Sequence, residues 1–347
     1  MVSGKYIARI TLIASLTLIG SCYEHAIPSP WVKLTIDNSI SGFYRPVFLT
    51  EKTGFVLGGY QHPAVVPVLL KTIDGGESWI TIKLHPPTAG GFAGFYPVSD
   101  KIIYATGASN DVVNNPWTIY KSTDTGETWM PLEGNYYKTP GAIHFFDENN
   151  AFMFFNGPMK SSDGGRNWER LPNPDSIDFS ALHAVVFPSK NVGYGLGGSY
   201  FDGVNFSIVF KTEDSGNTWK DITGKLSSNL SNATDWIFLD DNTGFVFTVD
   251  YQLYRTLDGG VNWELRNSGL PIIATGSVFF DHNEGYMCGG VGAGRVSHSG
   301  IYHTTDGGKT WKEEYSSNVS ESEMLSFPSN KIGYVTSHDY IFKKVLK

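Results

Sequence analysis

The chain has 347 residues, of which 41% are hydrophobic and 14% aromatic, with 39 glycines and a formal net charge of −8 at pH 7. This composition is sufficient for a buried core and is typical of many short strands joined by tight turns. The acidic balance argues against nucleic-acid binding, and the sequence has no basic cluster that would recruit anionic lipid. Only two cysteines are present, so no disulfide framework is expected.

Residues 1–21 are typical of a targeting signal. Two basic residues precede or enter an apolar stretch at 10–19, which is too short to span a membrane stably, and small residues follow it. The stretch ends in Ile19-Gly-Ser-Cys22, which resembles the bacterial lipobox, where the cysteine becomes the lipidated first residue. We therefore expect a lipoprotein-type signal, lipidation of Cys22, a tether at 22–30 and a membrane-anchored location in the bacterial cell envelope, periplasmic or surface-exposed. An ordinary secretion signal is the alternative.

One nine-residue pattern occurs six times along the rest of the chain. It consists of a basic residue or His, Ser or Thr, any residue, Asp, any residue, Gly, two further residues and Trp, as in Lys71–Trp79. Each copy lies between two short runs of extended character, which predicts a strand, a tight turn and a strand. The Asp positions of the six copies are Asp74, Asp124, Asp163, Asp214, Asp258 and Asp306.

Within each turn, we expect the repeated residues to be structural rather than catalytic. Asp74 can accept hydrogen bonds from turn amides that lack a ladder partner, and Thr72 can add another through its side chain. Gly76 supplies a positive φ angle that a β-carbon would disfavour. Trp79 begins the next strand with a large apolar surface. A calcium loop is the alternative, but one carboxylate per turn provides too few oxygen ligands.

The pattern Ser/Thr-x-Asp-x-Gly-x-x-Trp resembles the Asp-box, or BNR, repeat. This resemblance implies a β-propeller in which each box forms the turn between the third and fourth strands of a blade. Proteins with this repeat include sialidases, some glucan-degrading propellers, sortilin-type receptors and photosystem II assembly-factor-like proteins. The repeat alone does not choose among these families.

The spacing of the boxes predicts the number of blades. Successive Asp positions are 50, 39, 51, 44 and 48 residues apart, which fits four-stranded blades. A second pattern between the boxes, exemplified by Thr53–Gly59, predicts the second strand of each blade, and seven versions of it occur. The sequence therefore predicts an all-β, seven-bladed propeller at 31–347, and six or eight blades are the alternatives.

The seventh blade lacks a box of its own. Its second strand, Ile332–Thr336, is followed by one more strand before the sequence ends at Lys347. Trp31–Ile36 has no box before it but resembles the strands that follow boxes. We expect this N-terminal strand to complete the last blade and close the ring, which would tie down both termini.

Two propeller faces follow from this topology. The turns after first and third strands share one face and are short, whereas the connections after second and fourth strands, such as Gly198–Phe206, form an opposite, long-loop face. Binding residues concentrate on loops carried by a rigid scaffold, so we expect function on the long-loop face. The candidates open first strands near the channel mouth or lie in the long connections: Arg45, Trp117, Tyr137, His144, His183, Tyr200, Asp235, Trp236, Arg295 and Glu323. The alternative is that they are rim residues, solvated or paired with one another.

The sequence favours binding over catalysis. A sialidase-like site needs three Arg residues around the substrate carboxylate, and only Arg45 and Arg295 can reach the long-loop face. A glucanase-like site needs two carboxylic acids across a cleft, for which Asp235 and Glu323 are candidates, but the related enzymes use two propellers. No catalytic residues, cofactor or metal are therefore assigned. The chain resembles the photosystem II assembly-factor-like group, which implies a scaffold role on membrane-protein complexes. We expect a monomer that binds a protein or glycan of the cell envelope, and a glycoside hydrolase is the alternative.

Overall fold

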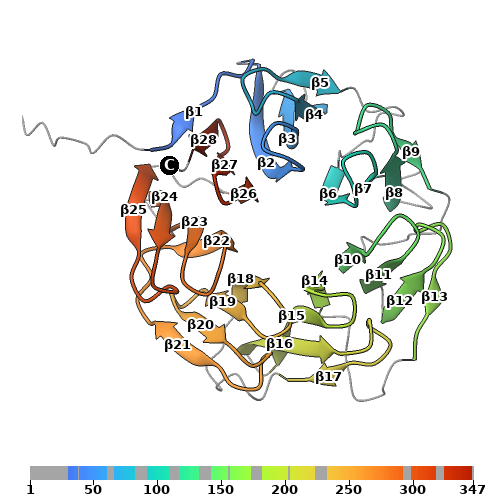
Figure 1. Cartoon of the computed structure of the whole chain (residues 1–347), viewed down its shortest axis with the longest axis vertical. Helices are drawn as coiled ribbons and strands as arrows, with labels where there is room; N and C mark the ends of the chain where they lie inside the picture. The colour runs from blue at the N-terminus through green and yellow to red at the C-terminus, as the bar shows by residue number, and fades with distance from the viewer. Residues whose placement is uncertain are drawn as a thin grey trace, which may run out of the picture.

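The computed structural model describes residues 30–37, 39–60, 66–82, 92–108, 117–132, 142–154, 157–172, 182–201, 204–222, 233–291, 298–317 and 324–345. These residues form seven four-stranded antiparallel sheets arranged in a ring (Figure 1). The predicted seven-bladed propeller is therefore confirmed. Residues 1–29, with the predicted signal and Cys22, lie outside the described ranges. Within those ranges, no helix is long and apolar enough to cross a membrane.

Six blades take four consecutive strands each. Blades 1 to 3 comprise β2 (Ile40–Phe48), β3 (Gly54–Tyr60), β4 (Val66–Thr72), β5 (Ile80–Ile82); β6 (Phe92–Pro97), β7 (Ile103–Ala108), β8 (Trp117–Ser122), β9 (Met130–Pro131); and β10 (Ala142–Phe145), β11 (Ala151–Phe154), β12 (Pro158–Ser161), β13 (Glu169–Arg170). Blades 4 to 6 comprise β14 (Leu182–Val186), β15 (Gly193–Phe201), β16 (Val204–Thr212), β17 (Lys220–Asp221); β18 (Ala233–Phe238), β19 (Gly244–Thr248), β20 (Leu253–Thr256), β21 (Glu264–Asn267); and β22 (Ile273–Phe279), β23 (Gly285–Val291), β24 (His298–Thr304), β25 (Lys312–Ser317).

Blade 7 combines the two ends of the described chain. Its first three strands are β26 (Met324–Ser329), β27 (Ile332–Thr336) and β28 (Ile341–Val345), and β1 (Val32–Lys33) pairs antiparallel with β28. The Leu34 amide extends this pairing by donating to the Ile341 carbonyl at 2.8 Å. Closure of the ring by the N-terminal strand is confirmed, although the regular strand is shorter than the predicted 31–36.

Trp31 takes the place of a box tryptophan in blade 7. Its side chain is buried, and its Nε1 donates to Glu314 Oε2 at 3.2 Å. Lys344 Nζ lies 2.6 Å from the same oxygen and donates to Tyr286 Oη at 2.9 Å. The contacts of Trp31 and of this buried ion pair connect the N-terminal segment and β28 to blade 6.

One aromatic pair lies at every blade interface. In each pair, a ring from the second strand of one blade contacts a ring in the first strand of the next, or directly after it for Phe187: Phe55–Phe95, Tyr104–Phe145, Phe152–Phe187, Tyr194–Phe238, Phe245–Phe279, Tyr286–Phe327 and Tyr334–Phe48. In blades 1, 4, 5 and 6, this ring also covers the glycine that opens the second strand of its own blade. A β-carbon at Gly244 would lie 2.5 Å from the Phe238 ring, which explains the glycine at this position.

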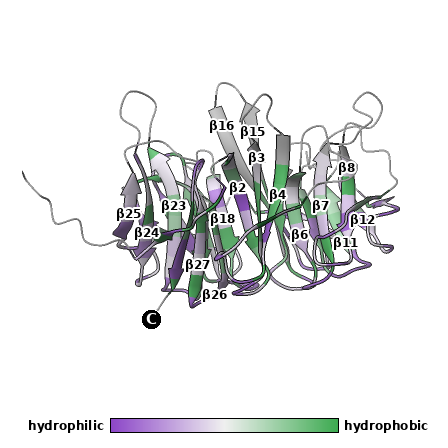
Figure 2. Cartoon of the chain, turned by 90° about the horizontal axis from the view of Figure 1, so that it is seen from above, coloured by the Kyte–Doolittle hydropathy of each residue, from purple (hydrophilic) through white to green (hydrophobic). Residues whose placement is uncertain are grey.

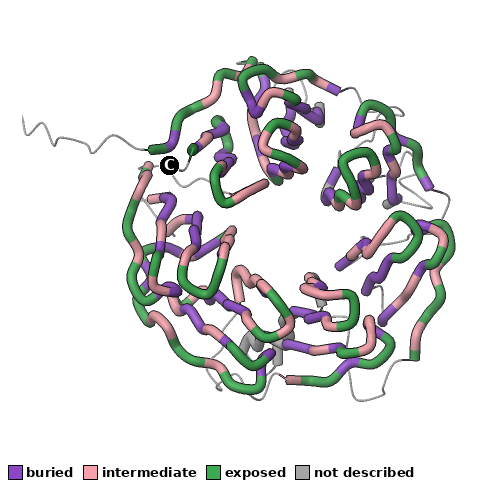
Figure 3. Tube along the Cα trace, in the orientation of Figure 1, coloured by how far each residue is buried: buried purple, intermediate pink, exposed green. Residues whose placement is uncertain are grey.

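The boxes and the turns between first and second strands share one face, which we call the box face. The Gly75 amide donates to the Lys52 carbonyl at 2.8 Å, and the Gly259 amide donates to the Asn242 carbonyl at 2.9 Å. In the side view, this face and the C-terminus lie at the bottom and the long-loop face lies at the top (Figure 2). Second strands are mostly buried, whereas the fourth strands β9, β13 and β17 are exposed (Figure 3).

Candidate functional site

Each box carboxylate is engaged within its own turn. In the first box, Asp74 Oδ1 accepts from the Ser78 amide at 3.0 Å and from Thr72 Oγ1 at 2.8 Å, and Asp74 Oδ2 accepts from Ser78 Oγ at 2.5 Å. The Gly76 amide donates to Thr72 Oγ1 at 2.8 Å, and its φ angle is +88°. The equivalent bonds hold the other five Asp residues. This geometry is that of a structural turn.

These hydrogen bonds keep the box carboxylates ionised. The side chain and amide of Ser78 hold the pKa of Asp74 well below its usual range. The Asn167 amide, together with the side chains of Asn167 and Ser161, lowers the pKa of Asp163 to about 2. Such carboxylates are acceptors with fixed partners, and they are poorly suited to accept or release a proton near neutral pH.

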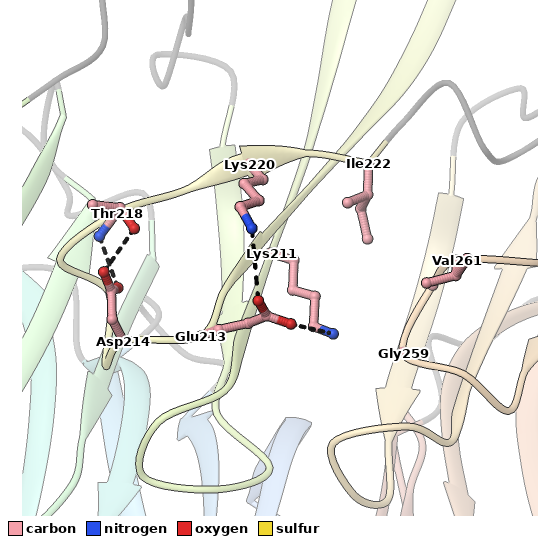
Figure 4. Close-up of a pocket in the computed structure, with 9 residues that line it drawn as sticks. Lys211, Glu213, Asp214, Thr218, Lys220, Ile222, Gly259 and Val261 are labelled. Carbon is pink, nitrogen blue, oxygen red and sulfur yellow. Dashed lines mark hydrogen bonds and ion pairs between the residues drawn. The ribbon is translucent and has the colours of Figure 1, made fainter.

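A cavity of about 340 Å³ opens on the box face between blades 4 and 5 (Figure 4). Glu213 lies between two lysines that line it, 3.1 Å from Lys211 Nζ and 3.7 Å from Lys220 Nζ. Asp214, also in the lining, is held by the Thr218 amide and hydroxyl. Glu213 and the two lysines drawn in Figure 4 are therefore paired with one another, and Asp214 is held by Thr218. Each charged side chain drawn there already has a partner, which makes this hollow a poor site for selecting a charged ligand.

Arg45 lies in an irregular part of the innermost strand of blade 1. The pairing of β2 with β3 shifts on either side of Tyr44, and Arg45 itself has a φ angle of +49°. Its side chain is exposed, and its positive charge opposes the rise that burial causes in the pKa of Tyr44 and of Tyr96. A left-handed backbone at a non-glycine residue costs about 1 kcal/mol or more, and such outliers gather at functional sites.

His144 lies on β10, the innermost strand of blade 3. Its ring centroid is 4.9 Å from that of Phe146 and 5.1 Å from that of Phe187, across the interface with blade 4. Burial lowers the pKa of His144 to about 4, so the imidazole is neutral at pH 7. The side chain therefore contributes an apolar contact and an uncharged polar edge to the inner wall.

Asp235 and Trp236 are neighbours on β18, the innermost strand of blade 5. Burial raises the pKa of Asp235 to about 6, against the lowering effect of Ser277 on β22 and of the Trp236 amide. Asp235 Oδ2 is buried and has no hydrogen-bond partner among the described residues. Trp236 contacts Phe238, with 5.8 Å between ring centroids. The carboxyl is thus held inside the blade interface and not on a solvated rim.

The remaining candidates are placed only in part. Trp117 begins β8, His183 lies in β14 and Tyr200 lies in β15, all toward the long-loop face. Tyr137, Arg295 and Glu323 lie outside the described residues. The four candidates with described side chains come from three separate blades, since Arg45 is on β2, His144 on β10, and Asp235 and Trp236 on β18. Among the described residues, no group of three or more metal-binding side chains occurs.

Sequence reasoning missed one element of the long-loop face. Gly198–Phe206 was expected to be a connection, but β15 continues to Phe201 and β16 begins at Val204, so that expectation is wrong for most of the segment. The overlooked signal is Asp202-Gly203, flanked by β-branched and aromatic residues. An Asp-Gly pair between such runs is a strong indicator of a two-residue hairpin.

Part of the chain matches the model of one protein family. Residues 211–320 match the family model for photosynthesis system II assembly factor YCF48. The matched part runs from the box of blade 4 to the end of blade 6. A solved structure described as YCF48 bound to D1 peptide has a TM-score of 0.68 at 16% identity, covering 92% of this chain and 96% of that chain. YCF48 from Cyanidioschyzon merolae gives the same TM-score and identity, covering 91% and 98%. These structures share the fold.

A curated relative belongs to a different functional class. A protein from Neosartorya fischeri described as a probable oligoxyloglucan-reducing end-specific xyloglucanase is 25% identical over an alignment of length 231, which covers 59% of this chain. The match spans only 28% of the length of that enzyme. The chain is therefore similar to a part of the enzyme that is much smaller than the whole.

Proposed function

We propose that this chain is an exported, lipid-anchored propeller that binds a protein partner through its long-loop face and has no catalytic role. The observation that carries the proposal is the match of residues 211–320 to an assembly-factor family. Support comes from the near-complete fold overlap with a propeller solved with a bound peptide. The engaged box carboxylates are consistent with a scaffold, because they have fixed structural partners.

Irregular pairing at the starts of the innermost strands supports the choice of face. Register shifts occur there in five blades, between Ser41 and Tyr44, Phe92 and Gly94, Leu182 and Ala184, Ala233 and Asp235, and Ala274 and Gly276. These strands begin at the long-loop face and end at the box face. Bulges redirect side chains and are over-represented beside binding and active sites. These irregularities support a binding site at the long-loop end of the inner wall.

Ligand screening of the full chain tests this proposal. The chain is presented with a phage-displayed library of random linear peptides and, separately, with a glycan array. We expect selection of peptides, and alanine at Trp117, Tyr137 and Tyr200 together should weaken their binding by about tenfold or more. The matched control replaces the exposed box-face residues Ile73, Leu257 and Val261 with alanine and should leave affinity unchanged. Selection of glycans alone would replace protein by glycan as the partner, and no selection at all would contradict a binding role.

The lipid anchor is a separate part of the proposal. Expression of the full chain in a bacterium with a labelled fatty acid should label the wild type and place it in the membrane fraction. Cys22→Ser should lose both the label and the membrane association. An unlabelled wild type released in soluble form would favour the ordinary secretion signal.

Glycoside hydrolysis is the second candidate, favoured by the similarity to the xyloglucanase. Burial raises the pKa of Asp235 to about 6, and a raised carboxyl pKa is a requirement for a general acid. The test is release of sugar from xyloglucan oligosaccharides by the full chain. Turnover that Asp235→Asn or Glu323→Gln abolishes would overturn the non-catalytic proposal.

A further inference from the structure

The β15–β16 hairpin extends beyond the rest of blade 4. The two strands pair at nine consecutive positions, from Gly193 opposite Thr212 to Phe201 opposite Val204. Among the described residues, the outer strand β17 pairs with Phe210 and Lys211, and not with the part of β16 that precedes Val209. A two-stranded ribbon therefore projects from the four-stranded sheet on the face proposed to bind the partner.

The outer edge of this ribbon has a defined pattern of backbone groups. The Ile222 amide donates to the Val209 carbonyl at 2.9 Å, so the peptide groups of Val209 point toward the outer edge. Because the direction of these groups alternates along a strand, the amides and carbonyls of Ser207 and Asn205 point the same way, away from β15. Among the described residues, β17 spans Lys220–Asp221 and no other strand pairs with this edge.

We infer that the β16 edge at Asn205 and Ser207 binds an extended peptide segment of the partner by β-strand addition. The inference rests on the proposed function and specifies where and how the peptide binds. A row of donors and acceptors at two-residue spacing is complementary to the backbone of another strand. The added strand would continue the row that β17 begins at Val209, so it would join a sheet whose other strands are already fixed.

Proline and alanine substitutions distinguish the contribution of the backbone amide from that of the side chain at this edge. Asn205→Pro and Ser207→Pro each remove one outward amide, and proline is tolerated at edge positions because no internal ladder bond is lost. Asn205→Ala and Ser207→Ala keep the amide and serve as matched controls. With a peptide selected from the phage-displayed library, we expect each proline variant to bind about tenfold more weakly and each alanine variant to bind like the wild type. Circular dichroism and the melting temperature check that the variants are folded.

Backbone methylation of the selected peptide provides a second measurement. N-methylation at successive positions should weaken binding at every other residue, since only alternate peptide amides face the edge. A uniform response, or proline variants that bind like wild type, would overturn the inference while peptide binding itself still supports the proposed function. Protection of the Asn205 and Ser207 amides from hydrogen exchange in the free protein would also overturn the inference, because these amides would already have partners. Failure of the wild type to bind any peptide would overturn both proposals, and concentration-dependent dimerisation abolished by Ser207→Pro would assign the edge to a second copy of the chain.

Discussion

Tyr334, in the last blade, donates a hydrogen bond from its Oη to the carbonyl oxygen of Gly75, in the first box, at 3.0 Å. Lys343 Nζ donates to the same oxygen at 2.8 Å. Gly75 has a φ angle of +76°, and a β-carbon there would lie 3.1 Å from both donor atoms. Two further box glycines face a tyrosine hydroxyl from the second strand of the preceding blade. An added β-carbon would lie 2.8 Å from Tyr104 Oη at Gly164 and 3.0 Å from Tyr194 Oη at Gly259.

The residue directly after the box Asp is glycine in four boxes and Thr or Ser in two, and this choice follows the second strand of the preceding blade. Where the second strand of that blade has phenylalanine, as at Phe55 and Phe152, the next box has Thr125 or Ser215 in the same left-handed conformation, with φ angles of +58° and +60°. Blade 5 has Phe245 before Gly307, but there Arg266 occupies the space, with Nε donating to the Gly307 carbonyl at 3.1 Å. Glycine therefore occurs where a hydroxyl or guanidinium group of the preceding blade occupies the space that a β-carbon would fill.

Gly259→Ser therefore tests this contact directly. The new β-carbon would lie 2.7 Å from Lys211 Nζ and 3.0 Å from Tyr194 Oη, so we expect a loss of about 1–3 kcal/mol in the free energy of unfolding. In a Tyr194→Phe background the same substitution should cost less, by about 0.5 kcal/mol or more, because the hydroxyl is gone. Urea denaturation of the four proteins measures this coupling. If the losses in the free energy of unfolding from Gly259→Ser and Tyr194→Phe were strictly additive, the hydroxyl would not be the reason for the glycine.

The buried ion pair at the ring closure should be sensitive to loss of one partner. Lys344 and Glu314 have side-chain exposures of 8% and 11%, so Lys344→Met would leave a buried carboxylate without its cation. We expect a loss of roughly 3 kcal/mol in the free energy of unfolding, which Glu314→Gln in the same chain should partly restore. Lys220→Met is the control, since Lys220 is 77% exposed and its pair with Glu213 contributes under about 1 kcal/mol. Equal effects of the two lysine substitutions would be the contrary result.

The box carboxylates predict the response to acid. The pKa of Asp163 is lowered in the folded protein to about 2, so its stabilising effect is present above its ordinary pKa and is lost as pH falls toward 2. The wild type should lose stability steadily from about pH 4 downward. Asp163→Asn should be less stable than wild type at pH 7, and this deficit should shrink in acid. Equilibrium unfolding between pH 2 and 7 provides the comparison, and a deficit independent of pH would contradict it.

The contribution of Asp235 to stability should change with pH in the opposite direction to that of Asp163. Its pKa is raised to about 6, so its favourable contribution is present below its ordinary pKa and is lost as pH rises through 6. Asp235→Asn should therefore be more stable than wild type above pH 6, by about 2–3 kcal/mol at most, and the gain should vanish near pH 4. His144 titrates in the same window in both proteins, so its effect cancels in the difference. Parallel melting-temperature profiles from pH 4 to 8 would contradict a buried carboxylate.

The fold could be predicted because its determinants are local and repeated. Asp74, Gly76 and Trp79 act within one turn, so their spacing in the sequence carries the geometry. Ring closure could also be predicted, because Trp31 precedes a short extended run, as the box tryptophans do, although no Asp box precedes it. In contrast, the environment of Asp235 depends on β22 of the next blade, about forty residues later, and no local pattern reports that burial. The extended β15–β16 hairpin had a local signal in Asp202-Gly203 that the repeat pattern obscured.

If the Asp boxes are structural and the partner contacts the opposite face, bound peptide should protect only the long-loop face. The measurement is hydrogen–deuterium exchange of the full chain with and without a peptide selected from the library. We expect slower exchange in the connections after second and fourth strands and at 198–208, with no change in the six boxes. Protection confined to the boxes, around Asp74 or Asp214 for example, would contradict it.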